Sequence, residues 1–293
     1  MNKYKITKAF LLCTPLAFIL FQGCSQNKQP ENDPKQGSHQ SDTGVKSATA
    51  DTEPPPPPLP RPNIEEMKPE QWLDYLSTED PTHTHHLNKT AEWKNDAMNL
   101  LREKAMDESS ESVLELGKQF EEIIQQKDRP SLIRDFALQH LMSLSEDTKD
   151  PSEIHTLSLR NMAKALEEKE ETLAGTALLG YSRLHQKDQL PEQDQKLAIQ
   201  ALKSILLSNE GGDASRISAL QVGHTFLGDQ LKEPAWKIAQ SSAPENVRTQ
   251  AIMALGNFGD TNIQNWLASL QNSTDNQYLK AAAEHALKRS LNH

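Results

Sequence analysis

After about residue 129 the chain repeats a pattern of apolar and polar positions that has the spacing of an α-helix. Apolar residues recur three and four positions apart, as one face of an amphipathic helix requires. Two segments carry the same or a closely similar residue at every compared position: Ile133-Arg134-x-x-Ala137-Leu138-x-x-Leu141 and Val247-Arg248-x-x-Ala251-Ile252-x-x-Leu255. Three further segments share the frame, at residues 173–181, 215–223 and 279–287. The pattern predicts a series of related helices.

Each copy of the frame carries an alanine at the same position. These residues are Ala137, Ala177, Ala219, Ala251 and Ala283. A small side chain at one point of a helix lets the neighbouring helix approach closely, so we expect all five to be buried. Second helices are predicted to begin near Pro151, Pro191, Pro234 and Thr261, with tight turns at Gly228-Asp229 and Gly259-Asp260. The result is a stack of helix-turn-helix pairs that bury one another's apolar faces.

The segment Val247-Arg248-x-x-Ala251-Ile252-x-Ala254-Leu255-Gly256-x-x-Gly259-Asp260 resembles a HEAT-type repeat of the short bacterial variety. The resemblance extends over about residues 213–290 and, less fully, over 130–207. It implies an all-α fold, an α-solenoid whose second helices line a concave surface for protein partners. We therefore assign residues 129–293 to a HEAT-like repeat domain and 63–128 to an N-terminal helical region. An unrelated helical bundle is the alternative.

The start of the chain has the layout of a secretory signal peptide over residues 1–23. A basic stretch, Met1 to Lys8, precedes an apolar stretch that is shorter than the ~20 residues needed to span a bilayer. The following Phe21-Gln22-Gly23-Cys24 resembles the bacterial lipobox. The resemblance implies cleavage before Cys24 and attachment of lipid, including acyl chains such as palmitate, to that residue. The alternative is an ordinary signal peptide with an incidental cysteine.

Residues 24–62 are polar and rich in proline, with a run of five prolines from Pro54 to Pro58. A segment with so few apolar residues cannot offset its own ordering entropy, and we expect a disordered linker. The proline run favours polyproline II, a stiff spacer of ~3.1 Å per residue. It could instead be a ligand for an aromatic groove. Ser25, rather than Asp, after the cysteine is typical of lipoproteins sorted to the outer membrane.

Composition narrows the possible functions. The formal net charge of −10 argues against nucleic acid as a partner and against adhesion to anionic lipid headgroups. The two cysteines, Cys13 and Cys24, both lie before the helical region, so disulfides and thiolate chemistry within that region are excluded. The sequence has no metalloprotease, nucleophile-elbow or phosphate-loop motif. We therefore predict no catalytic residue, no cofactor and no enzymatic activity.

His83, His85 and His86 form the densest group of potential metal ligands. We expect them in a solvated loop before a helix that begins near Thr90. The alternative is a zinc or copper site completed by Asp80 or Glu92, which would belong to an enzyme or enzyme-accessory domain. Two other histidines, His140 and His285, lie near interior positions of the frame and are predicted to be packing residues. The acidic run 167–171 is predicted to be a solvated face.

Trp236 and Trp266 occupy similar places on two neighbouring second helices. They could be exposed anchors for a partner, a role in which tryptophan is favoured, or they could pack between helix layers. Taken together, the sequence predicts a membrane-tethered, non-enzymatic protein-binding scaffold of the bacterial envelope. It would be held by lipid at the outer membrane, facing the periplasm or the cell surface, and would bind another envelope protein.

Overall fold

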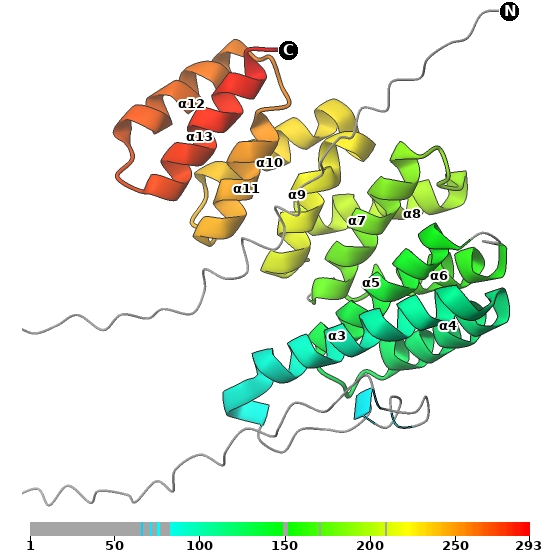
Figure 1. Ribbon diagram of the computed structural model, residues 1–293. Helices are drawn as coiled ribbons and strands as arrows, with labels where there is room; N and C mark the ends of the chain where they lie inside the picture. The colour runs from blue at the N-terminus through cyan, green and yellow to red at the C-terminus, as the bar shows by residue number, and fades with distance from the viewer. Residues whose placement is uncertain are drawn as a thin grey trace, which may run out of the picture. The chain divides into compact units, whose positions relative to one another are not determined.

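A computed structural model of the chain consists of helices that follow one another in chain order (Figure 1). It describes residues 66, 71, 75–76, 83–148, 152–169, 171–208 and 210–293, and for 83–91 and 152 the backbone alone. The helices are α3 (His83–Glu108), α4 (Ser110–Gln125), α5 (Ser131–Asp147), α6 (Ser152–Ala165), α7 (Thr172–Gln186), α8 (Glu192–Leu207), α9 (Asp213–Leu227), the short 3₁₀ helix η2 (Gly228–Leu231), α10 (Lys232–Gln240), α11 (Glu245–Leu255), α12 (Thr261–Ser273) and α13 (Gln277–Ser290). The described residues contain no strand.

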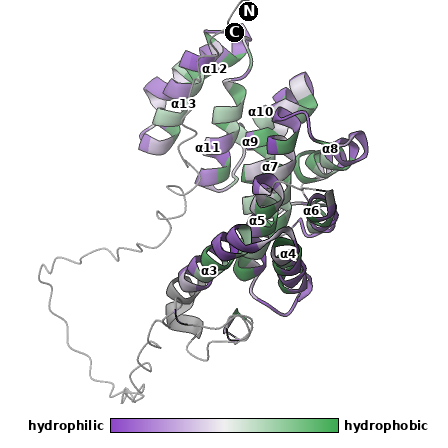
Figure 2. Cartoon of the chain, turned by 45° about the vertical axis from the view of Figure 1, so that its right-hand side comes forward, coloured by the Kyte–Doolittle hydropathy of each residue, from purple (hydrophilic) through white to green (hydrophobic). Residues whose placement is uncertain are grey.

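The helices form two layers. In the first-helix layer, each of α3, α5, α7, α9, α11 and α13 packs against the next one in that series. The second-helix layer holds α4, α6, α8, α10 and α12, and its members contact one another less closely. Hydrophobic residues lie between the layers, while hydrophilic residues dominate the outer sides of α3, α4 and α8 (Figure 2). This arrangement is an all-α solenoid of stacked hairpins, as the sequence predicted.

The five alanines of the repeated frame all lie in the first-helix layer and are fully buried, which confirms their predicted burial. Gly256, at the end of α11, marks another close approach within this layer. A Cβ placed on Gly256 would lie 2.9 Å from the Cα and the carbonyl oxygen of Ala286 in α13. Because backbone atoms cannot move aside, only glycine fits here. Small residues therefore set the spacing of the first helices.

A buried arginine joins successive hairpins. Arg134, in α5, is 2% exposed, and its Nε donates to the carbonyl oxygen of Ile124 at the end of α4 (2.8 Å). Its Nη2 donates to Glu168, in the turn before α7 (2.6 Å). Arg248 holds the same frame position in α11 and makes a longer contact, 3.4 Å, with the carbonyl of Ala239 at the end of α10. A cation at the C-terminal end of a helix complements unpaired carbonyls and the helix dipole.

The contact between Arg134 and Glu168 also corrects the prediction for the acidic run 167–171. Glu168 is only partly exposed because it pairs with a buried cation. Lys169 donates to Ser204 (2.5 Å) and Glu210 (2.7 Å), which ties the turn to the end of the next hairpin. The run was predicted from charge alone as a solvated face, whereas two of its side chains hold neighbouring repeats together.

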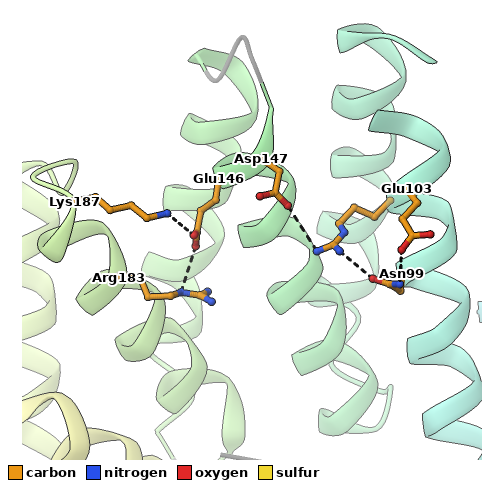
Figure 3. A network of polar contacts seen from close by, with 7 residues as sticks. Asn99, Glu103, Glu146, Asp147, Arg183 and Lys187 are labelled. Atoms are coloured by element: carbon orange, nitrogen blue, oxygen red, sulfur yellow. Dashed lines mark hydrogen bonds and ion pairs between the residues drawn. The ribbon is translucent and has the colours of Figure 1, made fainter. Parts of the chain in front are cut away.

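Ion pairs secure one edge of the first-helix layer (Figure 3). Glu146 lies at the C-terminal end of α5, where a negative charge is unfavourable. Its carboxylate contacts Lys187 Nζ at 2.7 Å and Arg183 Nε at 3.3 Å, both near the end of α7. The adjacent Asp147 lies 3.9 Å from Arg102 of α3. These cations offset the helix-end repulsion and connect three consecutive first helices.

The hairpin of α3 and α4 belongs to the same two layers, since α3 contacts α5 and α4 contacts α6. The preceding residue Leu76 is 1% exposed. Its carbonyl accepts hydrogen bonds from Arg129 Nη1 (2.5 Å) and from Lys94 Nζ (3.4 Å). A short piece of chain before α3 is thereby fixed to the array.

Candidate functional site

The two tryptophans singled out in the sequence contact each other. Trp236 in α10 and Trp266 in α12 have ring centroids 5.0 Å apart, with the ring planes tilted by 54°. Both side chains are partly buried and pack against the core. The rings bridge two second helices that are otherwise loosely packed. Each ring packs on its neighbour and on the core, as the packing alternative predicted, and still keeps exposed area.

An ion pair lies beside the tryptophan pair. Lys232 lies one turn before Trp236 in α10, and its ammonium contacts the Oδ2 atom of Asp260. Asp260 is the N-cap of α12, and its Oδ1 accepts from the backbone amides of Asn262 (2.8 Å) and Ile263 (3.3 Å). The Lys232 ammonium, together with these amides, lowers the pKa of Asp260. The carboxylate is therefore held charged and in one orientation.

A polar pocket of about 320 Å³ opens at this ion pair. We call it the turn pocket, and it is lined by Asp229, Lys232, Asn257, Phe258, Gly259 and Asp260. It lies between the turn that follows α9 and the turn that joins α11 to α12, so consecutive hairpins supply its two sides. Its size is near the lower end of the ~300–1,000 Å³ typical of ligand sites, which suits a single side chain or a small molecule.

The outer face of α12 carries no charge. The helix contains no Asp, Glu, Lys or Arg, although charged residues make up 25% of the chain. Its exposed positions are Thr261, Asn262, Asn265, Ser269, Asn272 and Ser273, all of them uncharged. Depletion of charge beside aromatic residues is typical of the central part of protein–protein interfaces. The face therefore extends the surface that begins at the tryptophan pair.

The histidine cluster lies elsewhere in the fold than predicted. α3 begins at His83, so His83, His85 and His86 belong to its first turn and not to a loop. Their side chains lie outside the described ones. Within the described residues, no group of three or more His, Cys, Asp or Glu side chains is arranged to hold a metal ion.

The two histidines predicted to be packing residues differ in outcome. His140 is buried and its Nε2 lies 2.9 Å from Asn95 Oδ1, which confirms the prediction. His285 is exposed on the outer side of α13, so the prediction for it was wrong. Among the described helices, α13 packs against α11 and α12, and His285 lies on neither contact. Glu284, the adjacent residue, is also exposed.

The proposed anchor lies outside the described part of the chain. This holds for Cys24, the signal peptide of residues 1–23 and the linker of residues 24–62. Among the helices that the structure describes, none combines the length and the apolar character that a membrane crossing requires.

Comparison with known proteins gives remote similarities in structure alone. No family model matches the sequence, and no curated protein matches it. The chain is similar to an engineered protein with a TM-score of 0.43 and 15% identity, over 78% of this chain and 100% of that one. It is also similar to a designed armadillo repeat protein with a TM-score of 0.37 and 16% identity, over 75% of this chain and 98% of that one. Similarities at this level carry no functional argument, and the solenoid is established by its own helix packing.

The turn pocket is the part of this surface that sequence reasoning missed. The two turns that supply it, Gly228-Asp229 and Gly259-Asp260, were recognised as separate features. Their repetition in consecutive units was a usable signal, because equivalent turns of stacked hairpins lie next to each other. The sequence did not indicate that Lys232 would reach across from one unit to Asp260 of the next.

Proposed function

We propose that the protein is a membrane-tethered, non-enzymatic scaffold that binds another protein of the bacterial envelope. Lipid on Cys24 would anchor it, and residues 24–62 would act as a spacer between the bilayer and the solenoid. The lipobox resemblance and Ser25 support an outer-membrane location, facing the periplasm or the cell surface. The fold supports a binding role, since a stack of hairpins presents a long surface built from many helices.

The observation that carries the proposal is the tryptophan pair beside the uncharged face of α12. Trp is among the residues that dominate binding energy at interfaces, and charged residues are depleted from interface centres. Trp236 and Trp266 are already held in place by each other and by the core. Binding through rings that are already ordered costs little side-chain entropy. We propose that this surface, formed by α10 and α12, receives the partner.

The repeat pattern supports a HEAT-like type for the solenoid. First and second helices alternate, a buried alanine recurs at one frame position of the first helices, and a Gly-Asp turn recurs within two units. A non-enzymatic role is supported by where the most perturbed titratable groups lie. Burial raises the pKa of Asp135 to about 6, lowers that of His140 to about 4 and raises that of Tyr181. All three side chains are buried at helix contacts, away from the turn pocket.

Site-specific photo-crosslinking tests the binding surface. A photoreactive amino acid is introduced at Asn265, which is exposed on the uncharged face of α12, and separately at Glu284, which is exposed on the outer side of α13. We expect a discrete crosslinked protein from Asn265 in cells and none, or a different one, from Glu284. The Trp266→Ala variant should lose that crosslink, while Trp93→Ala, which changes another partly buried tryptophan, should keep it. Equal crosslinking from both positions would contradict the assignment of this surface.

The anchor is tested independently by the Cys24→Ala variant. After cell fractionation we expect the variant in the soluble fraction and the original chain in the membrane fraction, because neither lipid nor any described helix would hold the variant in the bilayer. The original chain should incorporate labelled palmitate and the variant should not. Membrane retention of the variant would refute the lipid anchor.

A further inference from the structure

The turn pocket is a preformed depression whose walls come from two successive repeats. Asp229 and Lys232 lie in and just after η2, and Asn257 to Asp260 form the turn between α11 and α12. One lining residue, Phe258, is held in place by neighbouring helices. Phe258 is buried, its carbonyl accepts from Ser290 Oγ of α13, and the ring of His224 packs edge-on against it at 5.5 Å between centroids.

The charges in the pocket do not balance. Asp229 and Asp260 contribute two carboxylates, and Lys232 contributes one ammonium. Asp229 is exposed, and among the described residues its carboxylate has no partner. The pocket therefore has a formal charge of −1, in a chain whose formal charge is −10. Its electrostatic complement is a cation.

The hydrogen-bonding groups favour the same kind of ligand. Asn257 uses its amide nitrogen to bond the carbonyl of Ala254 (2.9 Å), which leaves its side-chain oxygen as an acceptor. With the two carboxylates, the pocket offers three acceptor groups. A guanidinium has donors alone, arranged in a planar fork that matches carboxylates, whereas an anion would be repelled by the two carboxylates.

Lys232 occupies part of this site in the present structure. Its side chain is 43% exposed, so its ammonium can leave Asp260 and return to water at little cost. Asp260, in contrast, stays in place because α12 uses it as an N-cap. An incoming cation would therefore compete with Lys232 for a carboxylate that is already oriented.

We propose that the turn pocket binds the guanidinium of an arginine side chain presented by the partner protein, with Lys232 as an internal competitor. This inference rests on the proposed scaffold function, which supplies the partner protein that carries the arginine. The partner would carry an arginine on its binding surface, and the partner's residues beside that arginine would contact the tryptophan pair. Lys232 and Trp236 are one helical turn apart in α10, so the pocket and the tryptophan pair lie along the same side of that helix.

The test uses the full-length chain with N-ethylguanidinium as probe and N-ethylurea as its uncharged analogue. Selective ¹⁵N-glycine labelling limits the spectrum to the 12 glycine amides, among which Gly259 reports on the pocket. We expect N-ethylguanidinium to shift the Gly259 resonance in a saturable manner and N-ethylurea to leave it unchanged. Added salt should weaken the effect, since the site is solvent-accessible.

Three variants then separate a binding site from a structural contact. Lys232→Met removes the competitor and should tighten binding, whereas Asp229→Asn and Asp260→Asn should weaken it. Each change should be roughly two- to fivefold, as expected for one exposed ion pair. Asn is also a favoured N-cap, so Asp260→Asn keeps the start of α12 intact. Glu284→Gln removes one negative charge from α13, as the two Asp→Asn variants do from the pocket, and should leave binding of the probe unchanged.

Each outcome decides the proposal. Equal responses to the guanidinium and the urea, or weaker binding by Lys232→Met, would overturn it. Failure of the scaffold function is distinguishable: the probe would still bind at Gly259 while crosslinking from Asn265 recovers no partner. Conversely, Asn265 could crosslink a partner with the same yield in the Asp229→Asn and Asp260→Asn variants as in the original chain. That result would support the scaffold function and refute arginine binding in the turn pocket.

Discussion

Replacement of Arg134 by methionine tests whether a buried arginine holds consecutive hairpins together. Methionine retains a long, flexible stem and removes the guanidinium. The variant loses the hydrogen bond to the carbonyl of Ile124 (2.8 Å) and the one to the carboxylate of Glu168 (2.6 Å). The Ile124 carbonyl then lies at a buried helix end without its donor.

The expected loss of stability follows from these two bonds. Hydrogen bonds that involve a charged group contribute about 1.5–3 kcal/mol each. Glu168 is 21% exposed and regains some hydration in the variant, and the methionine stem keeps part of the packing. We therefore expect a loss of about 3 kcal/mol in the free energy of unfolding. For a domain of this size the corresponding fall in Tm is roughly 6–12 °C.

The assay is urea denaturation of the full-length chain followed by far-ultraviolet circular dichroism, with thermal melting as a second measurement. Arg248→Met provides a matched control, since Arg248 has the same frame position but is partly exposed and makes a single contact at 3.4 Å. It should lose no more than about 1 kcal/mol. Glu168→Gln completes a double-mutant cycle with Arg134→Met and should show a coupling of about 1 kcal/mol or more.

Two results would refute this reasoning. A loss below 1 kcal/mol for Arg134→Met would mean that the guanidinium is replaced by water at no cost. Equal losses for Arg134→Met and Arg248→Met would mean that burial and contact distance at this frame position do not determine its contribution.

Three further predictions concern buried groups. Burial raises the pKa of Asp135 to about 6, so the free energy of unfolding should fall as pH rises from about 4 to about 6 and the carboxyl loses its proton. Asp135→Asn should remove this dependence and stabilise the chain at pH 7 by about 3 kcal/mol. Urea titration at several pH values measures both effects. Burial, with the charge of a nearby arginine, lowers the pKa of His140 to about 4, so the free energy of unfolding should fall as pH decreases from about 6.5 toward 4. His140→Gln should flatten that decline. A His140 ring-proton resonance, assigned by its absence in this variant, that titrates near 6.5 would contradict the prediction. Gly256→Ala should destabilise by about 1–3 kcal/mol because its Cβ meets the backbone of Ala286. Gly180→Ala meets the flexible side chains of Met142 and Met162 and should lose less. A neutral Gly256→Ala would show that α11 and α13 can separate.

Much of the fold could be predicted because its determinants are local and repeated. The apolar spacing fixes each helix, and the alanine of each frame copy marks a buried side of that helix. α8 and α12 begin within a residue of the predicted starts, whereas α10 begins two residues before Pro234 and includes it in its first turn. One error occurred where a residue's environment depends on a neighbouring unit: Glu168 pairs with Arg134 of the preceding hairpin. Another was local, because α3 begins at His83 and not near Thr90.

The candidate site was predicted in part. Trp236 and Trp266 were identified because they repeat on adjacent second helices, but the sequence left their packing and binding roles as alternatives. Their 5.0 Å contact depends on how α10 and α12 are rotated about their axes. The same holds for Lys232 and Asp260, which belong to different units and meet only when the hairpins stack.

The sequence by itself determined that this protein is a stack of helical hairpins, because helical periodicity, small residues and turn residues act over a few positions. Only the tertiary structure decided which side chains of successive units meet. Contacts between units depend on the rotation and translation of one hairpin against the next, and those quantities are set by the packing of all the side chains between them. The tryptophan pair and the turn pocket arise from that packing.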